Sequence, residues 1–163
     1  MLVVVADTTP IRYLAEIYHL DLLPRLFTTV CIPTAVYQEL QQSATPPSVR
    51  SQLATSPAWL VLAPEAPTTD PGLLALDEGE RAALTLGMTL HADLILIDER
   101  KGTAAAAQRG FETTGTLGLL VRAARLGLID LEDVFNRLKA TTFRHNKDLL
   151  PALLAQHQKN RKL

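Results

Sequence analysis

The chain contains a single cysteine, Cys31, among 163 residues. One cysteine excludes an intrachain disulfide and makes a zinc-cysteine cluster implausible. No apolar stretch approaches the ~20 residues that a membrane-spanning helix requires, and the first residues lack the basic leader of a secretory signal. These absences predict a protein of the reducing cytoplasm that makes no membrane contact.

The sequence also lacks an excess of charge of either sign, with 16 lysine and arginine residues against 17 aspartate and glutamate residues. The chain therefore has no overall positive charge that would attract a polyanion, and any surface that binds nucleic acid must be a local basic patch. The length and the apolar fraction of 47% fit one globular domain spanning residues 1–163.

The sequence does contain short apolar or β-branched runs that alternate with helical segments. This alternation predicts an α/β fold with a central parallel sheet of about four or five strands flanked by helices. Thr8-Thr9-Pro10 indicates a helix start with a hydroxyl cap and proline at the first helical position. Residues 43–48 are predicted to interrupt the regular secondary structure, and residues 64–72 are predicted to form a connection on the surface. The expected strands are residues 2–6, 28–32, 59–62, 94–97 and 111–113, and the expected helices are residues 8–18, 21–26, one opened by Pro33, a short one before Trp59, 77–91, 104–109, 116–127, 130–140 and 148–159.

Four acidic residues fall where this pattern brings them to one edge of the sheet. Asp7 and Asp98 directly follow apolar strands, so we expect both at the carboxyl ends of parallel strands, where open α/β sheets bind their ligands. Glu39 lies about two turns into the helix after the second strand, and Glu80 lies early in a later helix. Carboxylates held close together repel one another, and a bound divalent cation commonly neutralises this repulsion. The pattern predicts a metal site.

Three of these residues also have an ordinary local role, and Asp98 is the one least easily explained by local structure. Asp7 suits a turn that assists a helix cap. Asp77 followed by Glu80 resembles a reciprocal capping box, and Glu39 alone is typical of a solvated helix position. Local evidence leaves these alternatives open, and it is the joint order of the residues that favours a site.

That joint order resembles the PIN domain of VapC-like ribonucleases, and the resemblance covers nearly the whole chain. It implies a metal-dependent endoribonuclease that hydrolyses single-stranded RNA, acting as the toxin of a type II toxin-antitoxin pair. It also implies a homodimer and a short antitoxin protein as partners. The segments that carry the resemblance are residues 5–10, 33–40, 76–84, 96–102 and 114–120.

Carried over to this chain, the resemblance implies a catalytic pocket that holds Mg²⁺ or Mn²⁺. Hard divalent cations prefer such oxygen ligands. The pocket would consist of Asp7, Glu39, Glu80 and Asp98, with Thr8 or Thr9 as a hydroxyl that steadies a carboxylate or a metal-bound water. Asp77 would assist without binding the metal directly.

One departure concerns the position after the glycine of the Asp98 motif. Relatives of this subfamily tend to carry an arginine there, whereas this chain has Thr103. If that arginine holds a phosphate, Arg100 or Lys101 must substitute for it, or the activity is weakened.

RNA is expected to reach the pocket as a flexible single strand, because a duplex does not easily present its phosphates to recessed carboxylates. The candidates for backbone contacts are Arg12, Arg81, Arg100 and Lys101, although solvated charges or local ion pairs are equally compatible with each. The histidines lie outside the acidic motifs and are typical of surface or helix positions rather than general bases; they are His19, His91, His145 and His157.

Two other functions stay open. A PIN-like module that binds RNA or an antitoxin without cutting would fit Thr103 and the balanced net charge. A phosphoacceptor receiver-like domain also gathers acids at strand ends, but it needs a lysine after the last strand, where this chain has Thr114-Gly115. The sequence therefore supports a receiver-like domain much less than the two PIN-type functions.

Overall fold

The computed structural model describes residues 2–64 and 67–162. The chain forms two compact units, Met1–Thr116, which we call the sheet unit, and Leu117–Leu163, which we call the helical unit. In the described residues, no helix has both the length and the apolar character needed to span a membrane.

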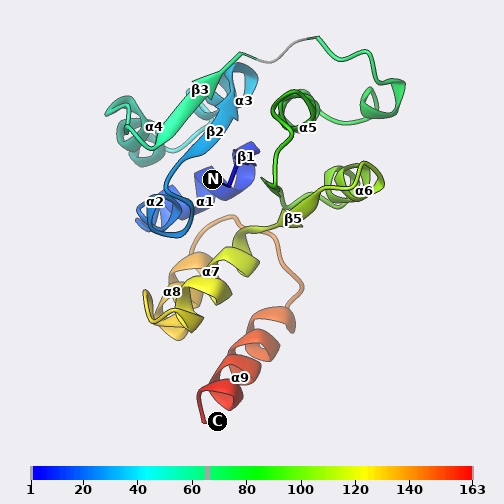
Figure 1. The fold of residues 1–163 in the computed structure, drawn as a ribbon. Coiled ribbons are helices and arrows are strands. Elements are labelled where there is room, and N and C mark those ends of the chain that lie inside the picture. The colour runs from blue at the N-terminus through cyan, green and yellow to red at the C-terminus, as the bar shows by residue number, and fades with distance from the viewer. Residues whose placement is uncertain (1, 65–66, 163) are drawn as a thin grey trace. The chain divides into compact units, whose positions relative to one another are not determined.

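A parallel sheet forms the centre of the sheet unit (Figure 1). Within the described residues it has five strands in the order β3-β2-β1-β4-β5, so the first strand of the chain lies in the middle. Every neighbouring pair is parallel. The predicted parallel, helix-flanked α/β sheet is therefore confirmed. The strands are β1 (Val4–Ala6), β2 (Val30–Pro33), β3 (Leu60–Ala63), β4 (Leu94–Leu96) and β5 (Glu112–Thr114).

The two strands that precede the expected site residues are adjacent and in register. Ala6 of β1 pairs with Leu96 of β4, and both strands are completely buried, as continuous apolar runs in a parallel sheet should be. The backbone N–H of Asp7 donates to the carbonyl of Leu96 at 2.9 Å. The chain therefore leaves β1 and β4 at the same edge of the sheet.

Helices connect the strands of the sheet unit. The α5 helix contacts β1, β2 and β4 as well as α3 and α6, and so occupies the middle of this packing. Its first turn is fixed by Asp77, which caps it. The helices are α1 (Thr8–Glu16), α2 (Leu22–Phe27), α3 (Thr34–Leu40), α4 (Pro47–Ala54), the short 3₁₀ helix η1 (Pro71–Leu73), α5 (Glu78–Leu90) and α6 (Arg100–Gln108).

Two buried clusters join α5 to the sheet. In one, Leu84 of α5 packs with Ile95 of β4 and with Leu73 of η1. In the other, Leu86 of α5 packs with Val5 of β1. The carboxyl edge of the sheet and the first turn of α5 are thus held by one continuous apolar packing.

Several predicted boundaries are wrong. The first helix begins at Thr8, with Asp7 at its N-cap and no side-chain cap, so neither threonine hydroxyl caps it and Pro10 is its third residue. The sixth helix begins at Arg100 rather than at residue 104, because the turn after Asp98 is already helical. The breaker at 43–48 is shorter than expected, since Pro47 opens α4.

The predicted surface connection at 64–72 is only partly irregular. Residues 65 and 66 lie outside the described residues. Pro71 opens η1, and Asp70 caps it by accepting the N–H of Gly72. Asp70 also forms an ion pair with Arg109 at 2.8 Å, and Leu73 is fully buried, so this end of the connection is anchored.

The helical unit contains α7 (Thr116–Arg125), whose first residue belongs to the sheet unit, together with α8 (Leu131–Lys139) and α9 (Leu149–Arg161). Gly127 has a positive φ of 75°, and this left-handed residue ends α7 at little steric cost. Asp130 caps α8 by accepting the N–H of Asp133. The α8 and α9 helices contact each other.

Truncation of Leu84 should test the packing of α5. Leu84 is fully buried, so Leu84→Ala should lower the free energy of unfolding by about 2–5 kcal/mol, measured by urea denaturation. Leu74, which is 62% exposed, is the matched control, and Leu74→Ala should change the stability by at most about 0.5 kcal/mol. Equal losses in both variants would contradict this account of the core.

Candidate active site

The carboxylate of Asp7 is buried at the end of the central strand. Only 3% of the residue is exposed, because β1 delivers it between the sheet edge and the first turn of α1. Its Oδ1 atom is buried and has no hydrogen-bond partner among the described residues. A buried polar oxygen without a partner costs about 1–3 kcal/mol, and more if it is charged. This oxygen is therefore a position that a proton or a cation would stabilise.

Glu39 approaches Asp7 from α3. The hydroxyl of Thr8 donates to Glu39 Oε2 at 2.9 Å, which ties the exposed carboxylate to the start of α1. Gly79 lies at the same point: a Cβ atom there would come within 2.8 Å of Glu39 Oε2 and 3.2 Å of Asp7 Oδ1. The missing side chain of Gly79 therefore leaves space where two carboxylates from distant parts of the chain approach one another.

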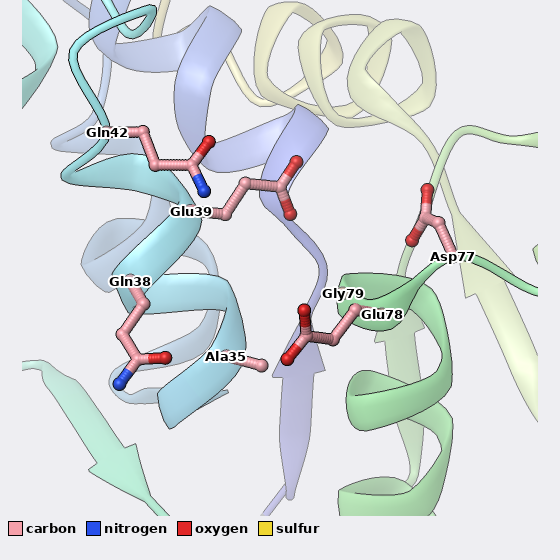
Figure 2. A pocket seen from close by; sticks show the side chains of 7 residues that line it. All are labelled: Ala35, Gln38, Glu39, Gln42, Asp77, Glu78 and Gly79. Atoms are coloured by element: carbon pink, nitrogen blue, oxygen red, sulfur yellow. The ribbon is translucent and has the colours of Figure 1, made fainter.

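This space opens into a pocket of about 300 Å³ between α3 and the start of α5. Figure 2 shows the carboxylate of Glu39 and that of Glu78 directed towards the region between the two helices, while Gln38 of α3 and Gln42, just after α3, border the pocket. The pocket is lined by Ala35, Gln38, Glu39, Gln42, Asp77, Glu78 and Gly79.

Glu80 takes part in the capping box that its sequence context suggested. Asp77 Oδ1 accepts the N–H of Glu80 at 2.8 Å, and Glu80 Oε2 accepts the N–H of Asp77 at 3.3 Å. Glu80 is nevertheless 5% exposed, which is unusual for a capping glutamate, and its carboxyl carbon lies 3.6 Å from the Cβ position of Gly102. Capping and a place in the acidic group are therefore compatible at this residue.

Asp98 is held by the start of α7. Its Oδ1 accepts the N–H of Thr116 at 2.8 Å, and its Oδ2 accepts the hydroxyl of Thr116 at 2.6 Å. Gly115 permits this approach, because a Cβ atom there would come within 2.5 Å of Asp98 Oδ1. Thr116 is fully buried, so both oxygens of Asp98 are fixed in direction by a rigid partner.

Burial and mutual repulsion alter the acidity of this group. Burial raises the pKa of Asp7 to about 8, against a hydrogen bond from the backbone of Thr8 that lowers it, and the charges of Asp77, Glu80 and Glu39 add to the rise. The pKa of Glu80 is also raised, first by burial and then by Asp77. Asp7, Glu39, Asp77 and Glu80 thus lie close enough to repel one another.

The pKa of Asp98 is raised by burial as well, although both hydrogen bonds from Thr116 lower it. The charge of neighbouring Glu99 adds to the rise. The structure thus brings Asp7, Glu39 and Glu80 together, and it places Asp98 just after the adjacent strand β4, where Thr116 holds it.

No three carboxylate, imidazole or thiol groups stand together as a ready-made metal cage within residues 2–64 and 67–162. The unpartnered Asp7 Oδ1 and the nearby Glu39 Oε2 nevertheless fit a hard divalent cation. Mg²⁺ is usually held by one or two carboxylates and completes its octahedral shell with water and substrate phosphate. The residues therefore suit a cation that arrives with its substrate.

The basic residues singled out in the sequence differ in their surroundings. Arg12 pairs with Glu16 at 3.1 Å and lies over the ring of Tyr13, which agrees with the local alternative, and Arg81 donates to the carbonyl of Leu76 at 3.5 Å. Arg100 and Lys101 are exposed at the first turn of α6. They are the two that remain accessible to a substrate beside the Asp98 motif.

Sequence reasoning assigned no role to Gly79 or to Thr116. The signals were present in the segments 76–84 and 114–120, where a glycine precedes Glu80 and a threonine follows Gly115. Their contacts with Glu39 and Asp98 depend on how elements distant in the sequence pack, which no local pattern reports. Thr9 is half-buried in α1, and the described contacts give it no link to a carboxylate.

A family model described as a PIN domain matches residues 3–159. The chain belongs to the PIN-domain family. PIN domains are generally nucleases that use divalent metal ions, so the family agrees with an acidic site at the carboxyl edge of this sheet. No curated protein and no solved structure gives a significant match to this chain.

The raised pKa of Asp7 predicts a dependence of stability on pH in the metal-free PIN domain. The folded state holds the proton up to about pH 8, whereas the unfolded chain loses it near 3.8. The free energy of unfolding should therefore fall as pH rises through this window and level off above it. Even half of the shift corresponds to about 3 kcal/mol.

Urea denaturation across this pH range, with a chelator present, measures the effect. Asp7→Asn should flatten the profile and stabilise the protein at the alkaline end. Asp21→Asn, which changes an exposed carboxylate, should leave the profile as in the wild type. An unchanged slope in Asp7→Asn would show that Asp7 is not the responsible group.

Thr116→Val should show what fixes Asp98. The substitution removes the buried hydroxyl that donates to Asp98 Oδ2, so the free energy of unfolding at neutral pH should fall by about 1–3 kcal/mol. Thr85→Val is the control, because the buried hydroxyl of Thr85 donates only to a carbonyl of its own helix, and its loss should cost less. The prediction fails if both variants unfold at the same denaturant concentration.

Proposed function

We propose that this PIN domain is a metal-dependent endoribonuclease that hydrolyses phosphodiester bonds of single-stranded RNA. The observation that carries the proposal is the buried, unpartnered oxygen of Asp7 beside Glu39 at the carboxyl edge of the sheet. The family match over residues 3–159 supports a nuclease, and the proposal takes residues 1–163 as one PIN-like domain.

The residues that would hold Mg²⁺ or Mn²⁺ are Asp7 and Glu39, with Glu80 and Asp98 completing the acidic pocket. All four offer carboxylate oxygens, which hard divalent cations prefer. When bound, such an ion activates water and neutralises charge on a phosphate. The chain itself would direct the ligands: Thr8 fixes Glu39, and Asp77 fixes Glu80 through the capping box.

A cation is also needed for a polyanion to approach. The sheet unit contains 13 aspartate and glutamate residues against 7 lysine and arginine residues, a formal net charge of −6. A phosphate group is repelled by such a surface unless a cation lies between them. Dependence on a divalent ion is therefore expected for substrate binding as well as for bond cleavage.

The substrate that suits the pocket is a single strand. The pocket of about 300 Å³ is bordered by Gln38 and Gln42, whose amides suit hydrogen bonds to exposed base edges. Arg100 and Lys101 are the proposed contacts for the RNA backbone near Asp98, and they would take over the role of the arginine that Thr103 replaces. Arg12 and Arg81 are weaker candidates because they already have local partners.

The biological role that we propose is that of a VapC-like toxin in a type II toxin-antitoxin pair. The partners would be a short antitoxin protein and a second copy of the chain, and the location would be the cytoplasm. The support is the resemblance of the five sequence segments. Co-expression with the protein encoded by a short neighbouring reading frame tests this role separately from catalysis.

A second candidate is a PIN domain that binds RNA or an antitoxin without cutting it. Two observations favour it: both oxygens of Asp98 already accept hydrogen bonds from Thr116, and the described residues hold no ready-made cage of three metal ligands. Binding of RNA with no cleavage under any divalent ion would select this alternative.

Cleavage of a labelled single-stranded RNA should decide between the two. The wild type should cut it with Mn²⁺ or Mg²⁺ and not with a chelator. Asp7→Asn, Glu39→Gln and Asp98→Asn should each slow cleavage by roughly 100-fold, with the fold retained. Glu112→Gln, at an exposed site on β5, should cut like the wild type. Wild-type rates in Asp7→Asn or Asp98→Asn would refute the proposed site.

A further inference from the structure

The helical unit contains a cavity of its own, of about 480 Å³. Its walls come from the end of α7, the turn into α8 and the last turns of α9. This volume lies within the range of small-molecule sites, which is about 300–1,000 Å³. The residues that matter in its lining are Arg125, Ile129, Asp130, His157, Asn160 and Arg161.

His157 is the most unusual residue of this lining. It is 6% exposed, and its Nδ1 atom is buried without a hydrogen-bond partner. Leaving a buried polar atom unpaired costs free energy, and an apolar residue would fill the same space without this cost. A buried polar atom without a partner calls for an explanation, and a ligand that reaches the imidazole of His157 would supply one.

Two exposed arginines line the cavity. Within the described residues, neither Arg125 nor Arg161 forms an ion pair or a side-chain hydrogen bond. The single acid of the lining, Asp130, already uses Oδ1 to cap α8. The lining thus has an excess of positive charge and offers guanidinium, amide and imidazole nitrogens to an oxyanion.

The net charge of the whole helical unit also favours binding of an anion. Nine lysine and arginine residues follow Thr116, against four aspartate and glutamate residues, so the unit has a formal net charge of +5. The balanced total for the chain hides this asymmetry. A basic unit raises the local concentration of anions around its cavity.

We propose that this cavity binds the phosphate group of a nucleotide, with Arg125 and Arg161 holding the oxygens and His157 and Asn160 completing their hydrogen bonds. Ala124 and Ile129 also line the cavity and give the nucleoside an apolar wall. The phosphate belongs either to a free nucleotide or to a residue of an RNA strand. The proposal does not depend on the nuclease function, since none of its residues belongs to the acidic pocket.

Calorimetric titration of the full chain, with a chelator to prevent cleavage, tests the proposal. The probes are inorganic phosphate, adenosine monophosphate and a single-stranded uridine hexanucleotide. The double variant Arg125→Gln and Arg161→Gln should weaken binding of the nucleotide and the strand by about tenfold or more, since each charge-assisted hydrogen bond contributes about 1.5–3 kcal/mol.

The matched control is the double variant Arg137→Gln and Lys159→Gln, which removes the same charge from exposed positions of α8 and α9 outside the lining. It should bind within about twofold of the wild type, because neither side chain lines the cavity. Asp7→Asn should bind normally, which separates this site from the nuclease. Equal weakening in both double variants, or no binding of any probe, would overturn the proposal.

The three probes distinguish the source of the phosphate. Similar affinity for the mononucleotide and the hexanucleotide supports a site for free nucleotide. Much tighter binding of the hexanucleotide, still lost in the double variant, supports a contact with an RNA strand. Binding of inorganic phosphate alone, with neither nucleotide nor strand retained, would contradict the apolar wall and with it the proposal.

His157 is tested without disturbing the fold. In protein labelled with ¹⁵N in histidine, saturation with adenosine monophosphate should shift the ring-nitrogen signals of His157. The signals of His19, His91 and His145 serve as internal controls, because none of them lines this cavity. Unchanged His157 signals at saturation would exclude the imidazole from the site.

Discussion

The burial of one carboxylate at the carboxyl end of the central strand is the constraint on which this structure depends. Asp7 is removed from water by the same packing that places β1 between β2 and β4, and its Oδ1 receives no hydrogen bond in exchange. Burial and the neighbouring acids together hold its pKa near 8. A group in this state gains free energy from any cation that reaches it.

The surrounding residues fix the geometry around that position. Gly79 keeps the space beside Asp7 and Glu39 open, and Thr8 directs one Glu39 oxygen towards it. Asp98 is directed separately, by the two hydrogen bonds from Thr116. Two carboxylate oxygens and the Thr8 hydroxyl therefore lie near the Gly79 position, and the carboxylate of Asp98 is held just after the neighbouring strand.

The sheet and part of the acidic site could be predicted from the sequence, because they follow from the pattern of neighbouring residues. The buried apolar runs before Asp7 and Asp98 predicted parallel strands, and both residues do follow adjacent strands. The spacing of Asp77 and Glu80 predicted a capping box, which is present. By contrast, the hydroxyls before Pro10 cap nothing, because Asp7 takes the N-cap position. Thr8 instead turns to Glu39, 31 residues away.

The sequence by itself determined the class of fold and the order of the acidic residues, because hydrophobic periodicity and the carboxyl ends of parallel strands are local properties of the chain. Tertiary structure alone decided which acids meet, that Asp98 is anchored by Thr116, and that the buried His157 shares a cavity wall with Arg125 and Arg161. These features arise from packing between segments far apart in the chain, whose distances and desolvation no local pattern contains.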